Sequence, residues 1–119
     1  MKELVYFTPM EFECNGKLCY LDMNEKFLER LDFARGITDV PFRISSSFRT
    51  EEHNEKIGGK PDSAHLKGLA VDISCTTSSE RFRIVKALIE AGFRRIGISK
   101  YFIHVDADDT KPQNVIWEY

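Results

Sequence analysis

The fold is decided around residues 63–74, whose sequence SAHLKGLAVDIS joins a polar loop to a short apolar segment. The pattern predicts a loop that ends at Gly68 and a β-strand over residues 69–74. Successive side chains of a strand point to opposite faces of its sheet, so Ala70 and Asp72 share one face. The apolar neighbours take the other face: Val71 and Ile73. We therefore expect a core on one side of this strand and a polar group on the other.

A second strand with the same alternation is predicted over residues 101–106. Here His104 shares a face with Asp106 and Phe102, while the apolar residues on either side of His104 point the opposite way. His65 lies seven residues before Asp72, and the small residues Gly68 and Ala70 leave room for the loop to turn back toward the strand.

The remaining segments show both helix and strand patterns without a regular βαβ alternation. We predict helices over residues 24–34, from Thr50 to Gly58-Gly59, and over 80–91, and further strands over residues 42–45, 95–98 and 115–119. In the first helix the inward face is Phe27, Leu28, Leu31 and Ala34, and in the last it is Phe82, Val85, Leu88 and Ile89. This mixture indicates one α+β domain over residues 1–119, with an antiparallel sheet and helices packed on one side.

Composition narrows the function classes. The 119 residues include 17 Lys and Arg against 19 Asp and Glu, for a net charge of −2. A near-neutral balance argues against binding to nucleic acid or to an anionic membrane. No export signal is recognisable in the first residues, so we expect synthesis in the cytoplasm. This expectation favours a phage-encoded or cytoplasmically stored protein. We separately expect the protein to be a monomer.

The three cysteines are predicted to be free thiols. Cys14 and Cys19 flank Asn15-Gly16, a strong turn pattern for a hairpin over residues 12–21. In a regular hairpin with Cys14 opposite Lys17, the two cysteine Cα atoms would lie about 7–8 Å apart, which is long for a disulfide.

The histidines and carboxylates on the two strands suggest a metal site. His65, Asp72 and His104 together offer two imidazoles and one carboxylate, the three-ligand shell of a catalytic zinc with one open position. Zinc at such a site supplies hydroxide at neutral pH and polarises a carbonyl oxygen, and both effects favour amide hydrolysis. Asp106 would then be the general base, and Arg49 would bind a carboxylate or stabilise the oxyanion.

Ordinary structural roles account for the same residues when each is taken alone. Asp72 could cap a turn, His104 could be a hydrogen-bonded core histidine, and Arg49 could lie on the surface. His53 is expected to be solvated. Asp106 belongs to an acidic cluster with the two aspartates that follow, but the spacing is not that of a calcium loop.

A family resemblance favours the metal site. Residues 63–72 follow the pattern S-x-H-x-x-G-x-A-x-D, which resembles the signature of the zinc D-Ala-D-Ala carboxypeptidase family. That family includes peptidoglycan endopeptidases, phage endolysins and the vancomycin-resistance dipeptidase, and it shares its fold with the hedgehog signalling domain. Further matching segments are S-x-x-R-[ST] at 46–50, G-G-x-x-x-S at 58–63, the strand at 102–106, and Trp117. The resemblance covers residues 7–119.

The resemblance implies zinc ligands at His65, Asp72 and His104. It also implies that Arg49 binds the substrate carboxylate or stabilises the oxyanion, and that Ser63 shapes the loop or hydrogen-bonds near the metal. The sequence departs from many relatives at one point, because Tyr101 stands where they place an acidic base, three residues before the last histidine.

Two functions follow as expectations. The first is a zinc metallopeptidase that hydrolyses peptide bonds of bacterial peptidoglycan, as a carboxypeptidase or an endopeptidase. The second is a zinc-stabilised module that binds the cell wall or a protein partner without cleavage, an alternative that Tyr101 keeps open. A hydrolase of small D-amino-acid dipeptides is a third, weaker hypothesis.

Overall fold

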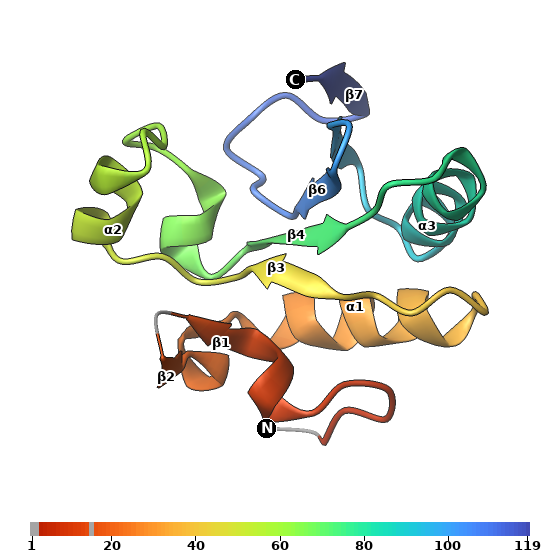
Figure 1. Ribbon diagram of the computed structural model, residues 1–119, viewed down its shortest axis with the longest axis horizontal. Coiled ribbons are helices and arrows are strands. Elements are labelled where there is room, and N and C mark those ends of the chain that lie inside the picture. The colour runs from red at the N-terminus through yellow and green to blue at the C-terminus, as the bar shows by residue number, and fades with distance from the viewer. Residues whose placement is uncertain (1–2, 15) are drawn as a thin grey trace.

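A five-stranded sheet forms the centre of the molecule in the computed structural model, which describes residues 3–14 and 16–119. Its strand order is β3-β4-β6-β5-β7 (Figure 1). The strands are β3 (Ile44–Ser46), β4 (Ala70–Ser74), β5 (Arg95–Ile98), β6 (Phe102–Asp106) and β7 (Val115–Glu118). A separate two-stranded hairpin joins β1 (Glu13–Cys14) to β2 (Lys17–Leu18).

The α+β class is confirmed, but the sheet is mixed. Neighbouring strands pair antiparallel except β5 and β7, which are parallel. The prediction of a wholly antiparallel sheet is wrong at β7 for a topological reason. After β6 the chain reverses direction and crosses to the far edge of β5, where β7 pairs. Strands β5 and β7 both run opposite to β6, and they are therefore parallel to each other.

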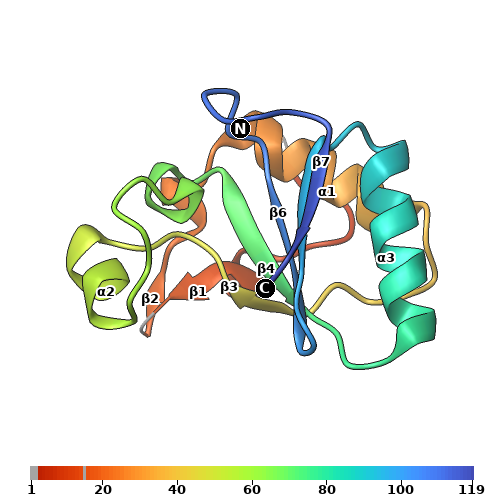
Figure 2. The same cartoon turned by 90° about the horizontal axis from the view of Figure 1, so that it is seen from above.

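Three α-helices surround the sheet. They are α1 (Glu25–Gly36), α2 (Glu51–Lys56) and α3 (Ser78–Glu90), and three 3₁₀ turns cover Pro9–Phe12, Tyr20–Asp22 and Ala64–Lys67. Helices α1 and α3 pack on the same face of the sheet. Figure 2 shows α3 on one side of β6 and β7 and α2 on the other, so the expectation of helices on one side holds for α1 and α3 alone.

Each α-helix begins at a side-chain cap. Asn24 Oδ1 accepts a hydrogen bond from the Phe27 N–H at 2.9 Å, and Thr50 Oγ1 accepts from the His53 N–H at 3.2 Å. The cap of α3 is Thr77, so this helix begins two residues before the predicted start at residue 80. Caps of this kind satisfy N–H groups that the helix itself leaves unpaired.

The core lies between the sheet and helices α1 and α3. The strand residues that face it are fully buried: Val71, Ile73, Ile96, Ile103 and Val105. The predicted inward face of α1 is confirmed, since all four residues are buried: Phe27, Leu28, Leu31 and Ala34.

The predicted inward face of α3 is wrong at two of its four positions. Phe82 and Ile89 are 69% and 51% exposed, and the buried residues are Ile84, Ala87 and Leu88. Apolar side chains extend around more than half of this helix, so the hydrophobic periodicity alone does not determine which side of the helix faces the core. The buried side of α3 contains the small residue Ala87, and a small residue at this position lets the helix pack closely against its neighbours.

The hairpin has the predicted pairing but not the predicted thiols. Cys14 lies opposite Lys17, and yet Cys14 and Cys19 form a disulfide with their Cα atoms 5.8 Å apart. Strand pairing ends at Leu18, and Cys19 turns into the following 3₁₀ segment with ψ near 13°, so the spacing of a regular ladder does not apply to it. Asn15 lies outside the described residues. Cys75 is a free, buried thiol, as predicted.

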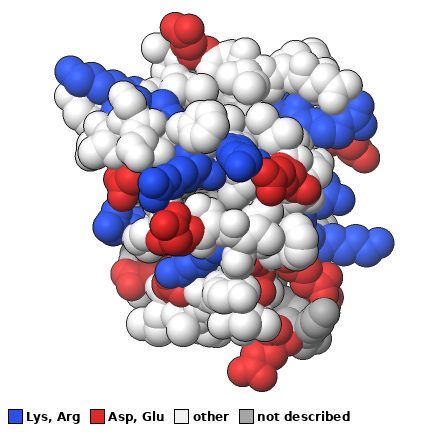
Figure 3. All heavy atoms as spheres, turned by 90° about the vertical axis from the view of Figure 1, so that its right-hand side faces the viewer, with Lys and Arg blue, Asp and Glu red and all other residues white. Residues whose placement is uncertain are grey.

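The surface shows no separation of charge on the side that carries α3. Figure 3 views this side and shows lysines and arginines interspersed with acidic and uncharged residues. None of the helices in the described ranges combines the length and the hydrophobicity that a membrane crossing requires.

Candidate metal centre

The sheet face opposite α1 and α3 carries two of the predicted ligands. Strands β4 and β6 pair with Asp72 directly opposite His104. Both side chains are largely buried, at 8% and 7% exposure. The same alternation that directs apolar residues into the core therefore directs a carboxylate and an imidazole to a shared position on the other face.

The third predicted ligand, His65, comes from the 3₁₀ turn Ala64–Lys67 that leads into β4. Ser63 caps this turn, since its Oγ accepts a hydrogen bond from the His65 N–H at 3.2 Å. The turn ends at Gly68 with φ of +68°, a conformation that favours glycine. A side chain at Gly68 would also collide with the Asp22 carbonyl oxygen. The signature glycine thus lets the loop fold back so that His65 faces the strand.

The donor atoms of His65, Asp72 and His104 lie within 4.8 Å of one another. Asp72 Oδ1 is 3.3 Å from His65 Nε2 and 3.0 Å from His104 Nδ1. Two ligands about 2.0–2.1 Å from a tetrahedral zinc stand about 3.3–3.4 Å apart, so these separations fit a shared cation.

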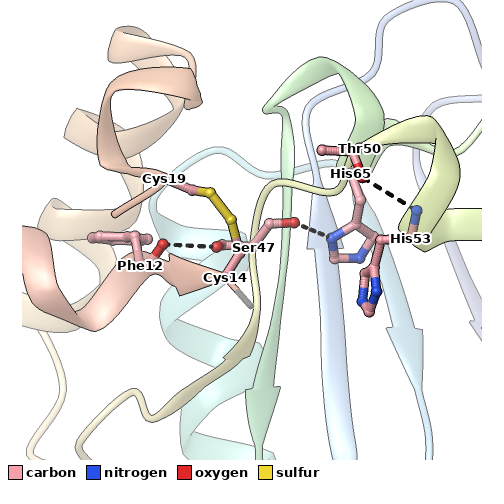
Figure 4. The surroundings of a disulfide bond; sticks show 7 residues. All are labelled: Phe12, Cys14, Cys19, Ser47, Thr50, His53 and His65. Atoms are coloured by element: carbon pink, nitrogen blue, oxygen red, sulfur yellow. Dashed lines mark hydrogen bonds between the residues drawn. A yellow bond between two sulfur atoms is a disulfide. The ribbon is translucent and has the colours of Figure 1, made fainter. Parts of the chain in front are cut away.

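The protonation of His65 also fits a cation. Its Nδ1 is 2.7 Å from the Ser47 carbonyl oxygen, which can only accept, so Nδ1 carries the proton and Nε2 presents a lone pair (Figure 4). Within the described residues this buried Nε2 has no hydrogen-bond partner, although it faces Asp72. A lone pair directed at a carboxylate, and buried, is an arrangement that a bound metal ion would stabilise.

Figure 4 also shows what holds Ser47 in place. The Ser47 hydroxyl donates to the Phe12 carbonyl oxygen at 3.2 Å, next to the disulfide-linked hairpin. The orientation of His65 therefore depends on a contact with the N-terminal part of the chain. Sequence reasoning did not identify this role of Ser47, because a backbone carbonyl leaves no pattern in the side chains.

A carboxylate holds the His104 ring on the side that faces away from Asp72. Its Nε2 is 2.7 Å from Asp106 Oδ2, which leaves Nδ1 directed at Asp72. Asp106 Oδ1 in turn accepts from Arg95 Nε at 2.7 Å, and Arg95 Nη1 donates to the Pro112 carbonyl oxygen. Carboxylates in this position fix the ring and raise the basicity of a metal-binding histidine.

This arrangement disfavours the predicted role of Asp106 as general base. Its carboxylate is only 2% exposed, both oxygens are engaged, and it contacts the side of His104 that points away from the other two donors. Tyr101, at the position of the acid in many relatives, lies just before β6, is 65% exposed and has no carboxylate. The identity of the base stays a prediction.

The contacts shift the pKa values of the three groups on the strands. Burial alone would raise the pKa of the Asp72 carboxyl, but the hydrogen bond from His104 and the proximity of both imidazoles outweigh it and hold the pKa well below its usual range. Burial would lower the pKa of His104, and its bonds to Asp106 and Asp72 raise it instead. The pKa of Asp106 is lowered despite burial, first by His104. In the protein without a cation, these groups therefore form an ion-paired set.

Arg49 lies at the edge of the donor set, close to Asp72. Its Nη2 is 3.5 Å from Asp72 Oδ2, and its backbone N–H donates to the His65 carbonyl oxygen at 3.1 Å. The side chain is 14% exposed, so the guanidinium is a partly accessible positive charge beside the three donors. Such a group can bind a carboxylate or an oxyanion.

Aromatic residues of β7 line the same face. The Trp117 ring lies 5.5 Å from that of His104 and 4.8 Å from the guanidinium carbon of Arg95. Gly97 on β5 makes this possible, because a Cβ there would collide with Trp117 and Tyr119. The sequence pointed to Trp117 through the resemblance but gave no indication that Arg95 would face the site.

Comparison with known families agrees with this geometry. The chain matches the family Peptidase M15 over residues 5–106, which is most of its length, and it belongs to this family of zinc D-Ala-D-Ala carboxypeptidase-like proteins. M15 peptidases are metal-dependent. A comparison with curated proteins finds no match.

Proposed function

We propose that the protein is a zinc-dependent peptidase that cleaves peptide bonds in bacterial peptidoglycan. The observation that carries the proposal is the unpartnered, buried Nε2 of His65, which faces Asp72 beside His104 Nδ1. Membership of the M15 family supports peptide hydrolysis, and the resemblance of residues 63–72 to the D-Ala-D-Ala carboxypeptidase signature supports cell-wall peptides as the substrate class.

The residues that would hold the metal are His65, Asp72 and His104. Two imidazoles and a carboxylate are a common donor set for catalytic zinc, which lowers the pKa of a bound water to about 7 and polarises a substrate carbonyl. Ser47 and Asp106 orient the two imidazoles through their second nitrogens.

Arg49 is the group that would contact the substrate. Its guanidinium carries a fixed positive charge and presents paired N–H donors, which match the two oxygens of a peptide carboxylate. Ser63, in contrast, contacts the His65 N–H and so acts on the loop rather than on the substrate.

Defined muropeptides provide the test. The purified protein is incubated with them before and after removal of metal by a chelator, and again after stoichiometric zinc is restored, and the products are identified by mass spectrometry. We expect cleavage that the chelator abolishes and zinc restores. Products that are unaffected by the chelator would contradict the proposal, and the mass of the fragment released distinguishes a carboxypeptidase from an endopeptidase.

The alternative is a zinc-stabilised binding module without catalysis. It is favoured by one observation, namely that Asp106 is buried in a bond to Arg95 and Tyr101 does not supply an acid. If the zinc-loaded protein cosediments with peptidoglycan and releases no fragment, this alternative replaces the peptidase.

A further inference from the structure

The contacts around Arg49 define how its guanidinium is held. Its Nε donates to Ser46 Oγ at 3.3 Å, its Nη1 to Asn54 Oδ1 at 3.3 Å, and its Nη2 lies 3.5 Å from Asp72 Oδ2. Each of the three nitrogens thus has a partner from a different segment of the chain. Of the five N–H groups that a guanidinium offers, three are used, and one remains on each terminal nitrogen.

Asn54 is an uncharged partner whose own position is fixed. The side chain belongs to α2 and is only 2% exposed. Its Nδ2 donates to the Lys60 carbonyl oxygen at 2.8 Å. A carbonyl oxygen can only accept, so the amide nitrogen must face Lys60 and Oδ1 must face Arg49.

Gly59 completes this arrangement. Its N–H donates to the Asn54 carbonyl oxygen at 2.8 Å, and a Cβ at Gly59 would overlap Asn54 Oδ1. Unlike Gly58, whose φ is +76°, Gly59 does not adopt a left-handed backbone. The requirement for glycine at position 59 therefore comes from the space that the Asn54 amide occupies.

We infer that Asn54 is a positioning residue for Arg49 and that it prepares this guanidinium to bind the carboxylate of a peptide substrate. Asn54 is a neutral acceptor, so it orients Arg49 without neutralising its charge, and the free N–H on each terminal nitrogen can engage both oxygens of a carboxylate. The inference rests on the proposed function, because it assigns Arg49 to substrate binding.

Two variants separate positioning from folding. Asn54→Leu removes both amide contacts at similar volume. Gly59→Ala leaves Asn54 in the chain but displaces its amide, because the atoms that the new Cβ would overlap belong to the Asn54 side chain and not to the backbone. Glu55→Ala, at an exposed neighbouring position on α2, is the matched control.

The kinetic readout compares one muropeptide that ends in a free carboxylate with its C-terminal amide. For both variants we expect KM for the free acid to rise about tenfold, the effect of one charged hydrogen bond, with kcat changed less than twofold. The amide and the Glu55→Ala control should show no such rise. Equal losses on the acid and the amide, or no loss on either, would overturn the inference.

A second readout does not depend on hydrolysis. In the metal-free protein, the Nε–Hε signal of Arg49 in a ¹⁵N NMR spectrum reports whether the guanidinium is held, and titration with N-acetyl-D-Ala-D-Ala reports binding of a carboxylate. We expect the signal to be sharp and to shift in the parent, and to broaden in both variants. If the parent cleaves no peptide, the proposed function fails, and an Arg49 signal unchanged by Asn54→Leu would separately refute the positioning role.

Discussion

Strands β4 and β6 place alternate residues on opposite faces of the sheet, and these two faces differ in polarity and in what stabilises them. One face is entirely apolar and packs on α1 and α3. The other holds Asp72, His104 and Asp106, which are also buried but are joined by hydrogen bonds. Burial stabilises the first face, whereas the second depends on each polar group finding a partner.

The largest effect is expected at the polar face. His104→Ala removes a donor and leaves Asp72 and Asp106 without their shared partner, so we expect metal retention and peptide cleavage to be abolished. Metal content after gel filtration and product release from muropeptides measure the two effects. Cleavage at the parental rate by a folded, metal-free His104→Ala protein would be incompatible with the proposed site.

Ile103→Ala makes the corresponding change one residue away, on the apolar face. Ile103 is fully buried between β4 and the helices, so its truncation should reduce the free energy of unfolding by about 2–5 kcal/mol. Urea denaturation gives the loss of stability. Metal affinity at low urea should stay within twofold of the parent, and a large drop would mean that the two faces are not independent.

Asp106→Asn tests the carboxylate behind His104. If Asp106 orients the ring, the substitution should weaken metal affinity by about 10–100-fold, the effect of losing such a partner. A competition titration with a coloured chelator measures it. An unchanged metal affinity with a sharply lower kcat would contradict the orienting role and would support Asp106 as the general base.

A smaller effect is expected beyond the end of β6, at Asp108. This buried carboxylate accepts from Thr110 and Lys67, and although burial would raise its pKa, those bonds hold the pKa well below its usual range. Because the pKa is lower in the folded protein, the contribution to stability is complete above about pH 4 and is lost as the pH falls further.

Asp108→Asn should therefore reduce the free energy of unfolding by about 1–3 kcal/mol at neutral pH. The difference from the parent should shrink gradually as the pH falls below about 4, because the carboxyl of the unfolded chain then takes up a proton that the folded carboxylate still resists. Urea denaturation at a series of pH values follows it. A difference that stays constant across this range would show that the charge of Asp108 is not what stabilises the loop.

Much of the fold followed from short-range patterns. Alternation placed Asp72 and His104 on one face, and the predicted helix starts at Asn24 and Thr50 coincide with the caps of α1 and α2. These features depend on neighbouring residues, which the sequence displays directly. The direction of β7 could not be predicted in this way, because it is set by which edge of β5 the chain reaches after a loop.

The site shows the same division. The three candidate ligands were predictable from their residue types and from the resemblance. The groups that orient them, such as the Ser47 carbonyl and Arg95, were not. Arg95 is a charged residue inside a predicted strand, and its burial to 8% exposure is explained by contacts with Asp106, the Pro112 carbonyl and Trp117. The disulfide was missed because Cys19 leaves the ladder, a deviation that the Asn15-Gly16 turn pattern does not reveal.

Gly97 has a consequence for how such a protein could diversify. The indole of Trp117 rests over a residue that has no side chain, directly beside His104. Any replacement here would push the indole away from the sheet and change the surface beside His104, while the backbone of the three candidate ligands would stay in place. Under the proposed function, a point mutation at this codon would therefore change which peptides fit beside His104 and would leave the candidate metal ligands in place.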